Sequence, residues 1–333
     1  MTKGPVTLHL DITNACNTDC VTCWDHSPLL TAPRAPAWKS RQADVDFLLA
    51  TVAEAASLGR LSTVIVSGMG EPLTHPRVLE LLAGLKTMGL GVTLISNLLA
   101  DAADRLPAGG VDTILIGIHS ADEAGYRAFH PSAAADAWSR LTRRLAARRA
   151  AGRRDRHVQV ICALNADKLG DMIDLAAAYD AERVNFKLAS LGRGTEAVRI
   201  TDGQRKRLLA EWIPEASARA ERRGVRHNLS TLRAQVLAGG AATAPIAEVG
   251  CHMGDRYARI AVDGTVYFCC NTETAIGRLG DGTGFSDLWH GSDWNAMRGR
   301  LARGEYFPGC ARCGKFEQNA KLAAKLRRAE NVA

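Results

Sequence analysis

Three closely spaced cysteines near the N-terminus constrain this chain more than any other feature. Cys16, Cys20 and Cys23 follow an apolar run at residues 6–12. Thiolates at this spacing hold three irons of a cubane [4Fe-4S] cluster and leave the fourth iron without a protein ligand. A cluster of this kind would require the fold to present three sulfurs from one loop, and its open iron is where chemistry can take place.

A zinc site is the alternative for the same cysteines. Structural zinc takes four ligands, which are usually cysteine or histidine. His26 follows the third cysteine and is the candidate fourth ligand. The spacing alone leaves both interpretations open.

The CxxxCxxC arrangement resembles the signature of radical S-adenosylmethionine (SAM) enzymes. The resemblance implies that the open iron chelates the amino and carboxylate groups of SAM, and that reduction of the cluster cleaves SAM to a 5'-deoxyadenosyl radical. The family usually has an aromatic residue just before the third cysteine, against the adenine. This chain has Thr22 there and Trp24 just beyond, so Trp24 is the candidate adenine contact.

A glycine-rich turn, Gly-Met-Gly-Glu-Pro at residues 68–72, follows the second predicted strand. Gly68 and Gly70 allow a backbone to approach a ligand closely, and the Glu71 carboxylate can accept hydrogen bonds from an ammonium group. The turn resembles the GGEP motif of radical SAM enzymes, with Met69 in place of one glycine. The resemblance implies that this turn contacts the SAM amino group.

The rest of the N-terminal part alternates β-branched runs with amphipathic segments, which is typical of an α/β fold with parallel strands. Six such units fit the partial (β/α)6 barrel that the resemblance implies. Predicted strands lie at 6–12, 62–67, 91–96, 113–119, 157–164 and 183–188, and predicted helices at 43–58, 76–88, 136–150, 169–179 and 201–237.

Polar residues stand where these strands end. Side chains at the C-terminal rim of a barrel face its mouth, which makes them ligand candidates. Ser96, Asn97 and Asn165 are the candidate SAM-site residues, with His119 and Lys187 as weaker candidates. The alternative is that they satisfy backbone groups of the loops.

A second group of cysteines lies near the C-terminus. Cys251 and Cys269 flank residues 258–268, which read as a β-hairpin with an Asp-Gly turn, and Cys310 and Cys313 form a CxxC pair. The hairpin brings the first two cysteines within reach of one site. Together the four supply a complete ligand set.

This C-terminal pattern resembles the twitch domain, the shortened form of the SPASM extension of radical SAM enzymes. The resemblance implies one auxiliary [4Fe-4S] cluster and hence two clusters in total, although a zinc site would need the same number of cysteine ligands. We expect a barrel at residues 1–237, a linker at 238–250 and a small β-hairpin and helix module at 251–333.

Two cysteines remain. Cys162 lies in an apolar strand and is expected to pack as a small hydrophobic residue. Cys270 follows a predicted cluster ligand on a hairpin strand, where alternation would aim it away from Cys269. It is expected either to pack or to face the substrate as a hydrogen-atom donor, and it is the candidate catalytic residue.

Composition excludes some partners. The formal charge of +7 comes largely from an arginine-rich helical segment at 140–156, and a run of this kind is usually a solvated face. Without aromatic residues interleaved for base stacking, we do not expect nucleic-acid binding. No apolar run of membrane-spanning length and no signal-peptide pattern is present, so we expect a cytoplasmic protein without membrane contact.

The resemblance implies an enzyme that abstracts hydrogen from an unactivated C–H bond and needs an external one-electron reductant of the flavodoxin or ferredoxin type. Only five residues precede the first strand, so we expect no N-terminal peptide-recognition domain. The short auxiliary domain resembles that of enzymes that act on sugars and aminocyclitols in antibiotic biosynthesis, which makes a carbohydrate-like substrate the leading expectation.

Two reactions compete. The first is epimerisation with Cys270 as hydrogen donor, and the second is dehydrogenation of a secondary alcohol through the auxiliary cluster. Peptide modification is the alternative substrate class. A non-enzymatic metal-binding scaffold is the distant alternative, and it would bind metal without consuming SAM.

Overall fold

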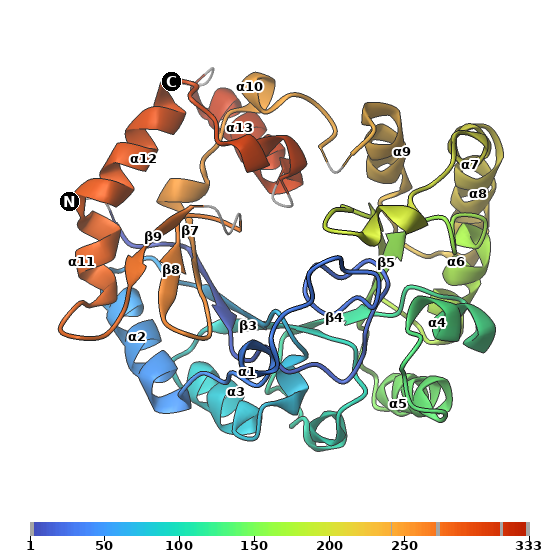
Figure 1. Ribbon diagram of the computed structural model, residues 1–333, viewed down its shortest axis with the longest axis horizontal. Helices are drawn as coiled ribbons and strands as arrows, with labels where there is room; N and C mark the ends of the chain where they lie inside the picture. The colour runs from blue at the N-terminus through green and yellow to red at the C-terminus, as the bar shows by residue number, and fades with distance from the viewer. Residues whose placement is uncertain (1–2, 241, 271–273, 314–315, 331–333) are drawn as a thin grey trace.

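The computed structural model describes residues 3–240, 242–270, 274–313 and 316–330. Its centre is a curved sheet whose first six strands are parallel and lie in the order β6-β5-β4-β3-β2-β1 (Figure 1). The predicted α/β partial barrel is confirmed. The strands are β1 (Thr7–Asp11), β2 (Thr63–Ser67), β3 (Gly91–Ser96), β4 (Thr113–Gly117), β5 (Arg156–Ile161) and β6 (Arg183–Leu188).

Helices cover the outer side of this sheet (Figure 1). Alternate strand residues such as Leu8, Val64 and Ile116 are fully buried in the core between strands and helices, because successive side chains of a strand point to opposite faces. The helices are α2 (Val45–Ser57), α3 (Val78–Thr87), α4 (Glu123–Phe129), α5 (Ala137–Ala150), α6 (Leu169–Ala178), α7 (Asp202–Arg207), α8 (Ile213–Arg223) and α9 (Leu229–Ala238), with the short α1 (Pro36–Lys39) in the loop after β1.

The C-terminal part joins the same sheet. β7 (Tyr257–Ile260) pairs in parallel with β1. β8 (Thr265–Tyr267) pairs antiparallel with β7, and β9 (Ala275–Arg278) pairs antiparallel with β8 at the edge of the sheet. The predicted hairpin is confirmed, with Gly264 in the left-handed conformation that its turn requires (φ 82°). The remaining helices are α10 (Ile246–Val249), α11 (Phe285–His290), α12 (Ser292–Ala302) and α13 (Phe316–Glu330).

Strands from before and after the predicted linker at 238–250 therefore belong to one continuous sheet. α9 ends at the start of this segment and α10 lies inside it. The proposed division at these residues separates parts of one sheet, because β7 lies directly beside β1. None of the helices in the described part of the chain combines the length and apolar character needed to cross a bilayer.

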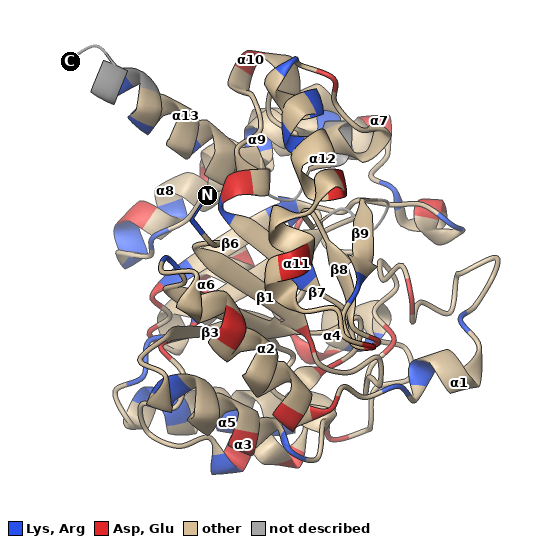
Figure 2. Cartoon of the chain, turned by 90° about the vertical axis from the view of Figure 1, so that its left-hand side faces the viewer, with Lys and Arg blue, Asp and Glu red and all other residues tan. Residues whose placement is uncertain are grey.

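The arginine-rich segment is ion-paired within the protein to a larger extent than expected. Arg144 is buried, binds both carboxylate oxygens of Asp104 (2.7 and 2.5 Å) and donates to the carbonyl of Leu98 (2.9 Å). Arg148 pairs with Asp155. Figure 2 shows acidic and basic segments interspersed over the helices. The prediction that this run is simply a solvated face is wrong for Arg144.

Arg144 also supports a strained backbone position. Leu98 is held at φ 62°, a conformation that costs a side-chain-bearing residue of order 1 kcal/mol or more. Its carbonyl accepts the Arg144 guanidinium. Since Leu98 follows the candidate residue Asn97, the helix α5 helps to shape the end of β3.

Replacing Arg144 with Met should lower the free energy of unfolding by about 1.5–3 kcal/mol, the value of hydrogen bonds to a charged group. Unfolding of the anaerobic holoprotein followed by circular dichroism measures this change. The matched control is Arg143→Met, because Arg143 is exposed and surface substitutions change stability little. Equal losses in both variants would contradict a special role for Arg144.

Candidate functional site

The first cysteine set lies in the loop that leaves the C-terminal end of β1. Thr18 Oγ1 lies 3.6 Å from Cys16 Sγ and 3.9 Å from Cys20 Sγ. The backbone N–H groups of Asp25 and His26 donate to Cys23 Sγ (3.5 and 3.4 Å). The two N–H donors favour the thiolate state of Cys23 that metal binding requires, and the single Thr18 hydroxyl can donate to Cys16 or to Cys20.

Burial opposes that state when no metal is bound. It raises the pKa of the Cys16 thiol to about 11 and also raises the pKa values of Cys20 and Cys23. Buried thiolates are costly unless a cation compensates their charge. The three free thiols therefore fit a site whose metal supplies the compensating charge.

Among the described residues, Cys20, His119 and His130 form a group whose three ligand atoms lie within 4.8 Å of one another. This group takes one cysteine from the loop after β1 and two histidines from the segments that follow β4 and α4. Zinc would need a fourth ligand beside the three cysteines of the loop, whereas a cubane takes each thiolate on a different iron.

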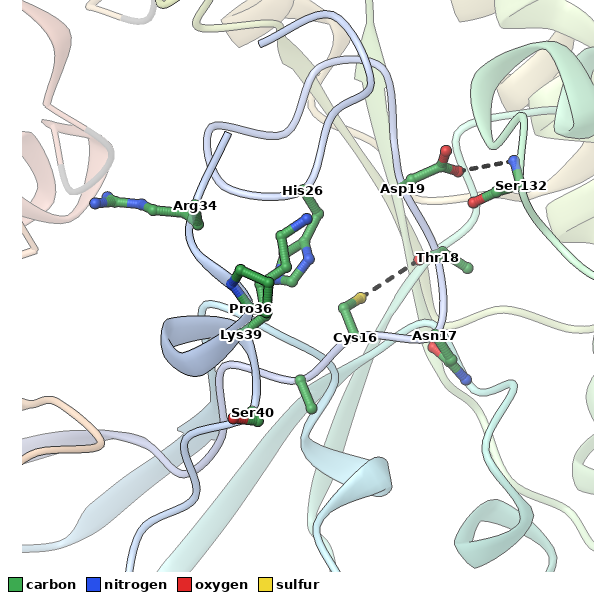
Figure 3. A pocket seen from close by; sticks show the side chains of 11 residues that line it. Cys16, Asn17, Thr18, Asp19, His26, Arg34, Pro36, Lys39, Ser40 and Ser132 are labelled. Carbon is green, nitrogen blue, oxygen red and sulfur yellow. Dashed lines mark hydrogen bonds between the residues drawn. The ribbon is translucent and has the colours of Figure 1, made fainter. Parts of the chain in front are cut away.

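The predicted fourth zinc ligand, His26, is not part of that group. Its ring packs against Trp38 with the centroids 6.1 Å apart. It lines, with Cys16 and Lys39, a hollow of about 650 Å³ between the cysteine loop and α1 (Figure 3). Figure 3 also shows Asp19 accepting the backbone N–H of Ser132 (3.0 Å), which ties the loop to the segment after α4.

Two histidines stand beside Cys20. The Tyr126 carbonyl binds Nδ1 of His130 (2.9 Å), so Nδ1 donates and the lone pair is on the buried, unpartnered Nε2. The Val160 N–H donates to Nδ1 of His119 (3.1 Å), so the proton of His119 is on Nε2. Burial lowers the pKa of His119 to about 3 and of His130 to about 4, which keeps both neutral.

The glycines of the predicted SAM turn approach the cysteine loop. A Cβ at Gly70 would lie 2.0 Å from the Ala15 carbonyl oxygen, and one at Gly68 would lie 2.4 Å from the Thr13 oxygen. The N–H groups of Gly70 and Glu71 donate to the carbonyls of Thr13 (3.1 Å) and Ala15 (2.8 Å). The two glycines were predicted to let the backbone approach a ligand closely. In the structure their backbone instead lies close to the backbone of Thr13 and Ala15.

The Glu71 carboxylate is buried beneath the end of β3. One oxygen accepts from Leu73 N (3.0 Å) and Ser96 Oγ (2.7 Å), and the other accepts from Asn97 N (2.6 Å). Burial raises its pKa to about 7 against the effect of these donors. A direct contact with SAM stays a prediction, while the observed contacts place Glu71 as a support for Ser96 and Asn97.

Asn97 connects this support to the cysteine loop, because its Nδ2 donates to Asn17 Oδ1 (2.7 Å) and Thr18 Oγ1 (3.2 Å). Asn165 behaves differently. Its Oδ1 accepts from Cys162 N (2.9 Å), and its Nδ2 donates to the carbonyls of His119 (2.8 Å) and Val160 (2.9 Å). Both amide hydrogens of Asn165 are committed to backbone, as in the alternative considered above. Cys162 is buried, as predicted.

A cavity of about 430 Å³ lies between the cysteine loop and the C-terminal cysteines. Trp24 lines it with 44% of its surface exposed, and its Nε1 donates to the Ser190 carbonyl (2.5 Å). The structure brings all four predicted auxiliary ligands to this wall. Residues that line the cavity include Thr22, Trp24, Asp25, Arg34, Val160, Lys187, Ser190, Arg193, Cys251, Arg259, Cys269, Cys270, Cys310 and Cys313.

The prediction that strand alternation separates Cys269 from Cys270 is wrong. β8 ends at Tyr267, and both cysteines lie in the bend that follows and line the same cavity. Cys269 Sγ lies 3.5 Å from Thr274 Oγ1, and Cys251 Sγ accepts from Asn319 Nδ2 (3.8 Å). Burial raises the pKa of Cys251 and Cys310, so this set also fits a metal cluster.

His130 is the site residue that the sequence did not indicate. It follows α4, and the return of the chain places it beside Cys20, which lies more than a hundred residues earlier. Its only local signal is the nearby strand-end histidine His119. Arg259 was also missed, because its partner Asp11 (2.7 Å) lies on a distant segment.

Comparison with known proteins adds independent findings. Residues 10–178 match the radical SAM superfamily, and residues 251–314 match the SPASM iron-sulfur cluster-binding domain. The AdoMet-dependent heme synthase of Methanosarcina barkeri is 24% identical over 94% of this chain and 92% of its own length. These matches confirm the predicted [4Fe-4S] clusters and SAM as cofactors.

Solved structures share the fold at low identity. Streptococcus suis SuiB superposes with a TM-score of 0.65 and 14% identity, over 89% of this chain and 68% of SuiB. The structure of anSMEcpe with bound AdoMet and the Cp18Cys peptide has a TM-score of 0.64 and 14% identity, over 95% of this chain and 88% of anSMEcpe.

Replacing Cys16, Cys20 and Cys23 together with Ala should reduce the iron content of the anaerobically reconstituted protein from about eight to about four per chain. SAM cleavage should be lost while the auxiliary cluster remains visible in the absorption spectrum. Iron analysis with assay of 5'-deoxyadenosine measures both. Stoichiometric zinc in place of iron in the unmodified protein would contradict the cluster assignment.

Replacing Glu71 with Gln puts an amide N–H₂ where two oxygens accept three donors. Asn97 or its neighbours lose an acceptor, and SAM binding to the holoprotein should weaken roughly tenfold, or about 1.4 kcal/mol. Equilibrium binding measures this change, with unchanged iron content as the control for integrity. Glu80→Gln, at an exposed carboxylate on α3, is the matched variant and should bind SAM normally.

Proposed function

Because this chain belongs to the radical SAM superfamily, we propose that it is an enzyme that removes a hydrogen atom from a substrate held between its two cysteine sets, and that Cys270 returns hydrogen to the opposite face. One observation carries the proposal: Cys270 and Trp24, from the two ends of the chain, line the same cavity. When bound, the cluster and SAM supply the radical chemistry that breaks an unactivated C–H bond.

The chain's own residues hold and orient these groups. Cys16, Cys20 and Cys23 are the proposed ligands of the catalytic cluster, and Cys251, Cys269, Cys310 and Cys313 those of the auxiliary cluster. Trp24, Gly68, Gly70, Ser96 and Asn97 are the proposed SAM contacts. Glu71 acts through Ser96 and Asn97, whose donors it binds, and Asn165 acts through the backbone at the ends of β4 and β5.

Cys270 is the proposed hydrogen donor for epimerisation. Its S–H bond breaks as a new C–H bond forms on the substrate carbon, which leaves a thiyl sulfur. One electron from an external reductant of the flavodoxin or ferredoxin type and one proton from solvent restore the thiol. The neighbouring auxiliary cysteines line the same wall, which supports a short path for that electron.

Dehydrogenation is the second candidate reaction. Here the C–H hydrogen of a secondary alcohol is removed first, and the resulting carbon radical then gives up one electron while its hydroxyl loses a proton. The product is a ketone, and no hydrogen is returned. The position of the auxiliary cysteines supports dehydrogenation, because a cluster bound by them would lie beside the substrate and could accept the electron. The two reactions differ in product mass and in the need for Cys270.

The substrate class expected from the sequence, a sugar or aminocyclitol, gains no support from the comparisons. A cationic aminocyclitol would also meet Arg34, Lys187, Arg193 and Arg259 on the cavity wall, against the single carboxylate of Asp25. A sugar that bears an acidic group remains compatible with this wall. Peptide modification is the alternative class, since SuiB and anSMEcpe are both solved with bound peptides.

The Cys270→Ala variant should keep both clusters and still release 5'-deoxyadenosine, yet fail to form inverted product. A screen of substrates by 5'-deoxyadenosine release supplies the substrate, and mass spectrometry of reactions in D₂O then follows the product. The unmodified enzyme should incorporate one deuterium at the inverted carbon, because a thiol exchanges its hydrogen with solvent.

Cys162→Ala is the matched control, because it removes a buried thiol outside the cavity walls. It should leave deuterium incorporation intact. Product two mass units lighter than the substrate would instead establish dehydrogenation. A fully active Cys270→Ala variant would remove Cys270 from the reaction.

A further inference from the structure

We propose that the substrate carries a carboxylate and that Lys187 and Arg193 bind this carboxylate. Both residues line the cavity between the two cysteine sets, on the same wall as Trp24 and Ser190. The inference rests on the proposed function, since it names the chemistry of the substrate in that cavity. Two observations carry it: the imbalance of charge on this wall, and the contacts that fix the residues presenting the charges.

The wall has more cations than anions. Asp25 lies 2.7 Å from Arg34 and 3.8 Å from Arg193, so two guanidinium groups share one carboxylate. Lys187 is exposed and has no ion pair or hydrogen bond to any residue that the structure describes. Three cations against one carboxylate leave a strong preference for an anionic ligand.

The position of Lys187 is set by its strand. In β6, Val184, Phe186 and Leu188 are buried against the helices, so Lys187 points to the other side, into the barrel. Its neighbour across the sheet is Val160 of β5, which lines the same cavity. Side chains at this end of a barrel strand face the ligand.

Arg193 is presented by a braced loop. Its backbone is left-handed (φ 62°), and its carbonyl accepts from Thr31 N (3.0 Å) and Thr31 Oγ1 (3.2 Å). The Trp24 indole N–H holds the Ser190 carbonyl of the same loop. A backbone held in a strained conformation by several contacts is typical of a functional position.

The fourth cation of the cavity, Arg259, already has partners inside the protein. It donates to the Cys270 carbonyl (3.3 Å) and pairs with the buried Asp11. Lys187 and Arg193 therefore remain for the substrate.

Binding of three matched probes to the anaerobic holoenzyme tests the inference. 1-Pyrenebutyrate, 1-pyrenebutanol and 1-pyrenebutylamine have the same aromatic ring with an anionic, a neutral and a cationic end, and pyrene fluorescence measures their binding. The carboxylate should bind about tenfold or more tightly than the alcohol, and the amine most weakly, because a charge-assisted hydrogen bond is made only with the first.

Lys187→Met and Arg193→Gln should each remove most of the difference between carboxylate and alcohol without changing the binding of the alcohol. Lys206→Met is the control, since it removes one charge from an exposed position on α7 outside the cavity walls. Equal binding of carboxylate and alcohol by the unmodified enzyme, or an equal loss in the Lys206 variant, overturns the inference. Iron content and SAM cleavage are measured separately, so a failure of the proposed function is distinguishable.

Discussion

The buried ion pair between Asp11 and Arg259 is the interaction on which the arrangement of this protein depends. Asp11 is the last residue of β1, and Arg259 lies on β7, which pairs in parallel with β1. Their side chains are 1% and 10% exposed. Burial raises the pKa of Asp11, and the Arg259 charge opposes that rise. Removing one partner of such a pair is costly, because the other charge is left buried.

This pair sets the two cysteine sets relative to each other. The catalytic cysteine loop starts directly after Asp11, and Arg259 also contacts Met69 Sδ and the Cys270 carbonyl (both 3.3 Å). One guanidinium thus contacts the end of β1, the glycine-rich turn at 68–72 and the bend at Cys270. The cavity exists between the two sets because strands joined by a ladder cannot move apart without loss of its hydrogen bonds.

Local patterns predicted much of this. The β-branched run at 62–67 became β2, and the Asp263-Gly264 pair became the turn between β7 and β8, because each depends on neighbouring residues. The pairing of β7 with β1 joins segments some 250 residues apart, so no local periodicity indicates it. The bend at Cys269 and Cys270 has the same origin: Phe268 is buried against Trp294 (5.2 Å between ring centroids), and β8 ends just before it.

The same distinction explains the site. Spacing alone predicted which cysteines bind the clusters, because a cluster imposes its geometry on nearby residues. The partners of Glu71 were not apparent, because they come from the end of β3. In the sequence, the Glu71 carboxylate beside two glycines therefore resembled a ligand to SAM. In the fold, this carboxylate accepts hydrogen bonds from Ser96 and Asn97. A residue type indicates what a side chain can bind, and only the fold decides which partner reaches it.

The charge and the geometry of the cavity would both suit the proposed epimerisation, in which hydrogen leaves one face of the substrate carbon and returns to the opposite face. A carboxylate bound by Lys187 and Arg193 would anchor a substrate on the wall of Trp24, beside the catalytic loop, while Cys270 faces the same cavity from the auxiliary side. Inversion of a carbon requires hydrogen to leave from one side and return from the other. An anchor at a third point prevents the substrate from turning over between the two steps, so the cation-lined wall would contribute to the stereochemistry as well as to binding.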